Sequence, residues 1–202
     1  MKYLILLLVL LACLPFASFA RDDSETGITV QIPLSYLSFS TTDASSTVNA
    51  TTIIGAAPIV GYRFSMGLVI GGTYDYWDND VKMTTATGAT SETDSTATGY
   101  GATVGLMSGG FGIFGSYLFS DNYQTGTKAP TDTRFTYTGG TGMRFDASYC
   151  FMVFSHFSLG PAVSYYTFTY TKEQDVKGNP IVLASNYQRS GINPYIKLDF
   201  TF

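Results

Sequence analysis

The chain has 202 residues, a formal net charge of −4 and only 13% charged residues, whereas an average soluble domain has roughly 25%. With 15 Tyr, 15 Phe and 21 Gly, it needs apolar surroundings or a very large core. The acidic balance argues against nucleic acid as a partner. Two cysteines, Cys13 and Cys150, are too few for a disulfide framework or a thiolate metal cluster.

The start of the chain predicts a secretory signal peptide, residues 1–20. Lys2 supplies the positive charge, Leu4 to Leu14 the apolar stretch, and Ser18-Phe19-Ala20 the small-x-small cleavage pattern. Cleavage after Ala20 would leave a single domain, 21–202. A lipoprotein box that ends at Cys13 is the alternative, and it would make Cys13 a lipidated amino terminus.

Large apolar residues then alternate with small or polar ones, which is the period of a β-strand. We expect strands at about 28–36, 54–64 and 68–76, with a tight turn near Ser65-Met66 between the second and third. The expected apolar face of these strands consists of Ile28, Val30, Ile32, Leu34, Tyr36, Ile54, Ala56, Val60, Tyr62, Phe64, Leu68, Ile70, Tyr74 and Tyr76.

Ser95 to Ser120 carries no charge, yet it is rich in Gly and Thr and is interrupted at Ser108-Gly109-Gly110. Gly and Thr are poor helix formers, so this segment predicts a hairpin of two strands and not a membrane helix. A sixth strand should have Tyr137, Met143 and Phe145 on its apolar face. The seventh, Phe157 to Tyr170, should contain a bulge near Tyr165-Tyr166.

The eighth strand alternates from Ile192 to Phe202. Between Ala147 and Phe157 a run of aromatic residues leaves the strand ends undefined. Short turns are expected near Ser65, Gly109 and Ser155. Long polar loops are expected at 39–50, 78–97, 121–134 and 171–189. Short turns and long loops alternate along the chain and so fall at opposite ends of an antiparallel barrel. This pattern predicts an all-β fold, an eight-stranded antiparallel up-and-down transmembrane β-barrel.

An apolar outer face would place the charges of the other face inside the barrel. These are Arg63, Asp75, Arg144, Asp146, Lys197 and Asp199, three of each sign. Eight strands leave an interior just wide enough for side chains, so mutual pairing in a closed interior is favoured over a gated ion path.

The last strand resembles the carboxy-terminal assembly signal of bacterial outer-membrane proteins, through Phe202, Phe200, Leu198 and Ile196. At the level of architecture, 21–202 resembles the small eight-stranded barrels of the outer-membrane protein A and X type. The resemblance implies a monomer in the bacterial outer membrane, in contact with its lipids and lipopolysaccharide. It also implies recognition of Phe202 by the outer-membrane assembly machinery.

His156-Phe157-Ser158 resembles the His-x-Ser pair of the lipid A deacylase barrels, with Glu173 and Asp175 as the nearest acids that follow. Both acids should lie beyond the far end of the next strand, so a triad is not expected to close. We therefore predict no catalytic residue and no cofactor.

Asp78, Asp80, Glu92 and Asp94 could bind a cation, but a solvated, mobile loop tip without metal is favoured. An aromatic belt at the membrane surface is expected from Tyr74, Tyr76, Trp77, Tyr100, Tyr123, Tyr166, Phe168 and Tyr170.

The sequence therefore favours a structural or surface-interaction role, with an unidentified extracellular ligand of the loops. A lipid A-modifying acyl hydrolase and a small ion-conducting channel are the alternatives.

Overall fold

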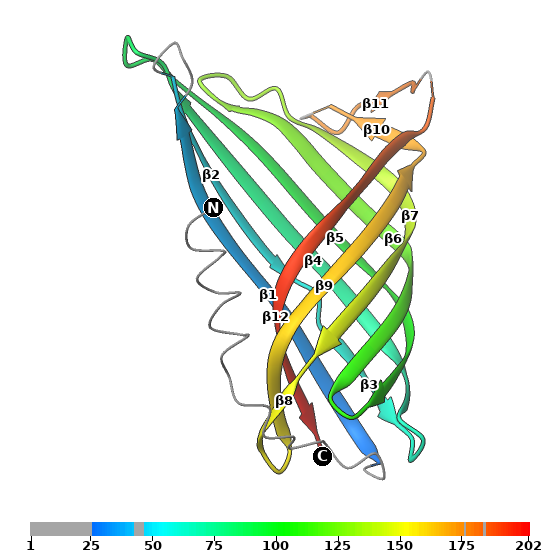
Figure 1. Cartoon of the computed structure of the whole chain (residues 1–202). Helices are drawn as coiled ribbons and strands as arrows, with labels where there is room; N and C mark the ends of the chain where they lie inside the picture. The colour runs from blue at the N-terminus through cyan, green and yellow to red at the C-terminus, as the bar shows by residue number, and fades with distance from the viewer. Residues whose placement is uncertain (1–25, 43–46, 176, 184) are drawn as a thin grey trace.

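The computed structural model describes residues 26–42, 47–175, 177–183 and 185–202. They form one antiparallel sheet that closes into a ring of eight strands (Figure 1). The predicted all-β, eight-stranded antiparallel barrel is thus confirmed. No helix among the described residues is long and apolar enough to cross a bilayer. The signal peptide, its cleavage after Ala20, and Cys13 lie outside the described residues and remain predictions.

Some strands of the ring are continuous and others are interrupted. The continuous ones are β1 (Gly27–Thr42), β4 (Leu68–Thr84), β5 (Thr90–Ser108), β6 (Phe111–Ala129) and β12 (Tyr187–Thr201). The second strand consists of β2 (Val48–Ala56) and β3 (Ile59–Arg63), the sixth of β7 (Phe135–Tyr149) and β8 (Phe151–Phe154), and the seventh of β9 (Phe157–Tyr170) and β10 (Lys172–Gln174). A further segment, β11 (Pro180–Ile181), pairs with β10 outside the ring.

The interruption of the second strand occurs at Ala57-Pro58, where proline has no N–H to donate. Neighbouring strands bond to the backbone on both sides of the break. Ala57 N donates to Pro33 O at 3.1 Å, and Tyr74 N donates to Pro58 O at 3.0 Å. Because β3 pairs with both β1 and β4, the ring remains continuous at this point.

The two faces of the sheet differ as expected from the alternation. In β1, Thr29 and Gln31 are fully buried, whereas Ile28 is 56% exposed. The large apolar side chains exposed along the other strands include Val60, Tyr62, Ile70, Tyr74, Tyr100, Val104, Leu106, Phe111, Ile113, Tyr117, Phe119, Met143, Phe145, Val163, Tyr165, Ile192 and Ile196. The predicted orientation, apolar side out and polar side in, is therefore confirmed.

Strands continue well into the predicted long loops, so those loop bounds were wrong. β1 pairs with β2 up to Thr42↔Val48, β4 with β5 up to Thr84↔Thr90, and β6 runs to Ala129. Polar residues predominate in these extensions, with scattered apolar ones such as Phe39, Val48 and Met83, so hydrophobic alternation did not reveal them. Their many threonines, which are β-branched, still favour extended backbone.

The irregular positions also differ from the prediction. β9 pairs with β12 from Phe157↔Phe200 to Tyr170↔Tyr187 without a register shift, so the predicted bulge near Tyr165-Tyr166 was wrong. Register shifts occur instead between β5 and β6, between β6 and β7 and between β8 and β9. In β7, Gly139 adopts a φ of +64°, and the strand changes phase around it. Tyr137 consequently points inward and is buried, contrary to the prediction.

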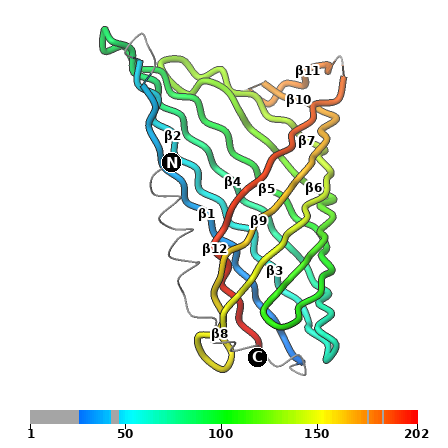
Figure 2. Tube along the Cα trace, in the orientation of Figure 1, coloured from blue at the N-terminus to red at the C-terminus, as the bar shows by residue number. Residues whose placement is uncertain are grey.

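The ring is closed by β1 and β12 over six residue pairs, from Thr29↔Thr201 to Leu34↔Ile196. Beyond Leu34↔Ile196 the two strands diverge, as Figures 1 and 2 show. There, among the described residues, β1 pairs only with β2, and β12 pairs only with β9. Pro194 lies two residues beyond Ile196 on this side and cannot donate to a ladder. We call the end of the barrel at Gly109 and His156 the short-turn end, and the opposite one the loop end.

Candidate functional site

The middle of the barrel interior holds an ion network centred on Arg144, which is 1% exposed. Its Nε donates to Asp146 Oδ2 at 3.0 Å, its Nη1 to Asp75 Oδ1 at 3.0 Å, and its Nη2 to Thr73 Oγ1 at 2.9 Å. The other oxygen of Asp146 accepts the hydroxyl of Ser164 at 2.6 Å. One guanidinium thus faces two carboxylates, and each of its nitrogens has an acceptor.

The other three interior charges lie nearer the short-turn end and are also buried. Lys197 Nζ donates to Ser148 Oγ at 3.2 Å and lies 4.3 Å from the ring centre of Phe114. Asp199 Oδ1 accepts the hydroxyl of Thr29 at 3.2 Å. Arg63 is 1% exposed. All six predicted charges are therefore inside the barrel, and Arg144, Asp75 and Asp146 share one network.

Two apolar layers also lie in the interior, and the one nearer the short-turn end is level with Arg63, Lys197 and Asp199. The layer toward the short-turn end consists of Ile59, Val69, Met107 and Phe114. The layer toward the loop end consists of Ala97, Leu118, Tyr123, Tyr137, Phe168 and Tyr170, with Trp77, Phe135, Tyr166, Leu183 and Tyr187 packed against it. An interior cavity beside Lys197 and Tyr195 measures about 10 Å³, roughly the space for one water. Side chains thus fill the interior along most of its length.

The aromatic residues near the loop end divide between the two faces. Tyr74 and Tyr100 are exposed on the outer face, where a membrane belt was predicted. Tyr123, Phe168 and Tyr170 are buried inside the barrel, so the belt prediction was wrong for them. Trp77 and Tyr166 also pack against the interior layer. In β9 the reason is the uninterrupted alternation, which places Tyr166, Phe168 and Tyr170 on the same inner face as Ser164.

Arg189 is a functional candidate that the sequence reasoning missed, because it was assigned to a loop. It lies on β12, and its guanidinium carbon is 5.4 Å from the ring centre of Trp77 and 4.8 Å from that of Tyr123. The rings of Tyr166 and Phe168 are 5.0 and 5.1 Å away. The signal was present in the sequence: Tyr187, Arg189, Gly191 and Asn193 continue the inner alternation of Tyr195.

Tyrosines extend this interior cluster toward the loop end. The rings of Tyr137 and Tyr187 stack with centres 4.1 Å apart, and Tyr123 stacks against Tyr187 at 5.9 Å. The hydroxyl of Tyr170 donates to Asp121 Oδ1. The loop end of the interior is therefore largely aromatic, with Arg189 and Asp121 as its charged members.

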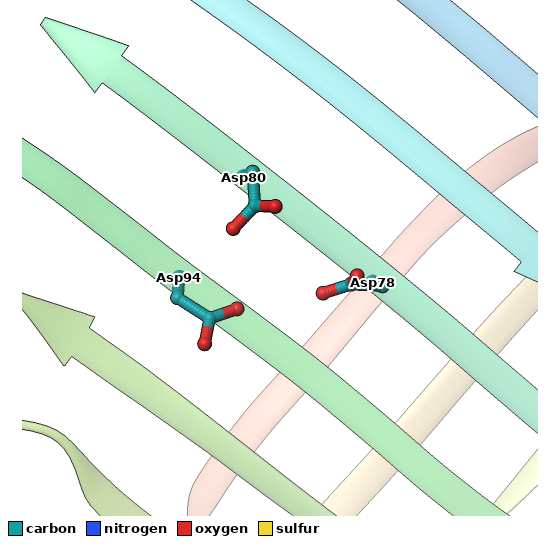
Figure 3. A group of neighbouring side chains, drawn as sticks. All are labelled: Asp78, Asp80 and Asp94. Atoms are coloured by element: carbon teal, nitrogen blue, oxygen red, sulfur yellow. The ribbon is translucent and has the colours of Figure 1, made fainter. Parts of the chain in front are cut away.

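An acidic group lies on the outer face, above the exposed apolar side chains. Asp78 and Asp80 come from β4 and Asp94 from β5, and one oxygen of each lies within 4.8 Å of the others (Figure 3). Burial, followed by the charges of Asp80 and Asp94, raises the pKa of Asp78. Arg134 donates to Asp94 at 3.0 Å, and its hydrogen bonds lower the pKa of Asp132 to about 2.

These carboxylates are the type of oxygen ligand that divalent cations take, although exposed acidic groups are common without one. Their expected position on a mobile loop tip was wrong. Asp80 and Asp94 are directly opposite each other in the β4–β5 ladder, as are Lys82 and Glu92. Strand pairing, and not a loop, brings the three aspartates together.

The His-x-Ser pair does not form a catalytic arrangement with the acids considered for it. His156 is exposed in the turn before β9, and its carbonyl accepts Thr201 N at 3.1 Å. Ser158 is buried inside the barrel. Glu173 lies in β10, beyond the opposite end of β9, and Asp175 follows it. A histidine at one end of a strand and acids beyond the other cannot act on one substrate group.

The four residues of the predicted assembly signal lie on the outer face of the last strand. Ile196 and Phe202 are exposed, and Leu198 and Phe200 are half-buried. Phe202 also contributes backbone hydrogen bonds to the closure of the ring. Its N donates to Ile28 O at 2.9 Å, and its O accepts Ile28 N at 3.1 Å. Recognition of these residues by assembly machinery stays a prediction.

No protein-family model matches the chain, and the comparison with curated proteins finds no match. Among solved structures, the crystal structure of the outer membrane protein OprG from Pseudomonas aeruginosa is similar, with a TM-score of 0.43 and 10% sequence identity. The similarity covers 87% of this chain and 96% of that one. A likeness of this size does not define a family.

Proposed function

We propose that the chain is a bacterial outer-membrane β-barrel with a structural or surface-interaction role, which displays its loop end outside the cell. The supporting observation is the ring of exposed apolar side chains around an interior that holds buried charges. A water-soluble barrel has the opposite arrangement, with large apolar residues inside and charges outside. Only a hydrocarbon environment makes such an outer surface favourable.

The height of the apolar surface fits a membrane. Along β12 and the residue that follows it, this surface extends from Ile192 to Phe202, about 33 Å at roughly 3.3 Å per residue. With a tilt of about 40°, this corresponds to about 25 Å along the barrel axis, the height of the apolar band in outer-membrane barrels. Beyond it the outer face becomes polar, at Ser190 on β12 and at Asp78 on β4. Lipids and lipopolysaccharide are the expected contacts of this band.

The proposed topology predicts which turns are outside the cell. Gly178 lies in the hairpin between β10 and β11, and Gly109 lies at the short-turn end. Both have positive φ and open space around them, so each should tolerate an inserted protease site. We expect added protease to cleave the Gly178 insertion on intact cells, and to cleave the Gly109 insertion only after permeabilisation. The reverse pattern, or no cleavage at Gly178, would contradict the proposed topology.

A small ion channel is the second candidate, because the interior carries the charges of Arg144 and Lys197. The closed interior is favoured, since the Arg144 network and the aromatic layer leave little space between the walls. Recordings in planar bilayers separate the two. Discrete conductance that changes in Lys197→Ala would favour the channel, and silent membranes would favour the closed barrel.

Recognition of the last strand by the assembly machinery is also part of the proposal. Phe202→Ala should lower the fraction of folded barrel in the outer membrane several-fold, measured by the mobility difference between unheated and boiled samples. Phe111→Ala is the matched control, because Phe111 is an aromatic residue of similar exposure at the same end, 64% against 72% for Phe202. Equal losses would mean that Phe202 is only a lipid-facing aromatic residue.

A further inference from the structure

The ladder between β1 and β12 stops partway to the loop end, where the two strands diverge (Figures 1 and 2). Among the described residues, 35–42 of β1 pair only with β2, and 187–195 of β12 pair only with β9. We call these two strand edges the seam. In the closed part, the backbone groups of Ile28 and Phe202 bond to each other. Because this pattern repeats every second residue, the even-numbered residues of both seam edges direct their N–H and C=O groups toward the opposite edge.

The seam begins at the level of the apolar band, so its lower part would be in hydrocarbon if the proposed membrane location holds. The band on β12 starts at Ile192, and on β1 the outer side chain of Tyr36 is 70% exposed. In the register of the closed part, Tyr36 would be level with Pro194, and Ser38 with Ile192. Hydrocarbon offers no hydrogen bonds, and an open sheet edge is therefore not stable there. This part of the seam needs a partner that supplies backbone groups.

Two apolar side chains beside the seam are uncovered as well. Leu37 is 39% exposed and Phe39 is 51% exposed. Both continue the inner alternation of Gln31 and Ser35, which are buried. Lipid chains can cover apolar side chains, but they cannot bond to the backbone. A partner that contributes strands satisfies both needs.

The directions of the two edges restrict which strands fit. β1 runs toward the loop end and β12 runs away from it, so a single added strand that is antiparallel to one edge is parallel to the other. A second copy of this chain offers one antiparallel strand to each edge. After a half-turn about the barrel axis, the β12 of that copy faces β1, and its β1 faces β12. The tilts also agree, because β1 and β12 lean to opposite sides toward the loop end and the half-turn exchanges these sides (Figure 1).

We propose that two copies of the chain pair through their seams as a symmetric dimer in the membrane. The axis of the dimer is parallel to the barrel axes, so both copies keep the same orientation, and the same two edges of each copy form the interface. The dimer goes beyond the proposed structural role and differs from the monomer that the resemblance implies. The ladder starts beyond Pro194, which has no N–H. In the register of the closed part, it joins Ser38, Ser40 and Thr42 of one copy to Ile192, Ser190 and Gln188 of the other.

Oxidation of introduced cysteines in membranes tests the pairing. The full chain is expressed with Ser38→Cys and Ile192→Cys, and with Cys150→Ser so that the buried native thiol takes no part. Residues that exchange both hydrogen bonds in an antiparallel ladder have Cα atoms about 5.5 Å apart, which suits a disulfide. We expect a covalent dimer on a non-reducing gel. A disulfide within one copy would mean that the seam closes on itself, and no disulfide would mean that the edges do not meet; either result would overturn the dimer.

Two controls accompany this measurement. Ile32→Cys with Leu198→Cys joins directly opposite residues of the closed part, so it should form a disulfide within one copy. Its formation in the membrane fraction supports the proposed barrel whatever the seam does, and its failure would contradict the barrel together with the dimer. Ile113→Cys, an outer position of β6 with 69% exposure, measures random collision. As much covalent dimer from Ile113→Cys as from the seam pair would count against the proposal.

A proline on the seam tests the backbone bonds. Odd-numbered residues of β1 bond to the second strand, as Pro33 O does with Ala57 N, so the N–H of Ser38 faces the seam. Ser38→Pro therefore removes one donor from each ladder of the dimer and none from the pairing with β2. We expect the dimer to dissociate at about tenfold higher or greater concentration, measured by sedimentation in detergent, while the gel mobility of the folded barrel is unchanged. An unaltered dissociation constant, or a wild-type chain that sediments as a monomer, would overturn the pairing.

Discussion

Arg144→Ala is expected to destabilise the barrel by about 3–5 kcal/mol, because it leaves two buried carboxylates without their shared counter-charge. Asp75 and Asp146 each receive one hydrogen bond from Arg144 at 3.0 Å, and both are buried beside it. The measurement is the free energy of unfolding in urea, with the barrel in detergent or lipid and the folded fraction read from gel mobility.

Arg134→Ala is the control for this prediction. Arg134 also pairs with two aspartates, at 3.0 and 2.8 Å, but it lies in the turn before β7, where its side chain is 23% exposed against 1% for Arg144. Its loss should cost about 1 kcal/mol, since water partly screens this ion pair and Asp132 is exposed. Equal costs for Arg134→Ala and Arg144→Ala would show that water reaches the Arg144 network. Asp75→Asn and Asp146→Asn, added to Arg144→Met, should restore much of the stability because they remove the buried charges.

The sequence was sufficient to predict the fold and the face of the sheet on which each of the six interior charges lies. The reason is the period of a strand: once Ile196, Leu198 and Phe200 are assigned to the outer face, Lys197 and Asp199 must lie inside. What alternation cannot give is which strands meet across the interior. Arg144 on β7 reaches Asp75 on β4, a contact that depends on strand tilt and register.

The wrong predictions lie where the outer face of the sheet is no longer apolar, or where the alternation along a strand changes phase. Above the apolar band the outer face is polar, so segments such as residues 78–84 of β4 have no apolar outer face, and the alternation predicts a loop there. Tyr137 was assigned outward because a single glycine, Gly139, shifts the phase after it. Arg189 was lost for the first reason. The aromatic cluster around Arg189 therefore lies where the outer face carries no apolar pattern, and only the inner alternation of residues 187–195 indicates it.

Val104→Arg should destabilise the folded barrel by about 2–4 kcal/mol, the cost of an arginine on the lipid face near the middle of the bilayer. Val104 lies on the outer face of β5 between Ile70 and Gly115, well inside the apolar band, and is 52% exposed. The free energy of unfolding in lipid vesicles gives the cost directly.

The control is Ser40→Arg, on the outer face of β1 but beyond the apolar band. An arginine there should cost about 0–1 kcal/mol, because it reaches water or lipid headgroups. Both side chains point away from the interior. The difference between the two free-energy costs therefore measures the surroundings of the outer face, hydrocarbon or water, and not a change in the packing of the barrel. If Val104→Arg is as mild as Ser40→Arg in vesicles, the outer face is in water. The interior charges would then need a different explanation, because an apolar surface in water would be the less stable arrangement of the same strands.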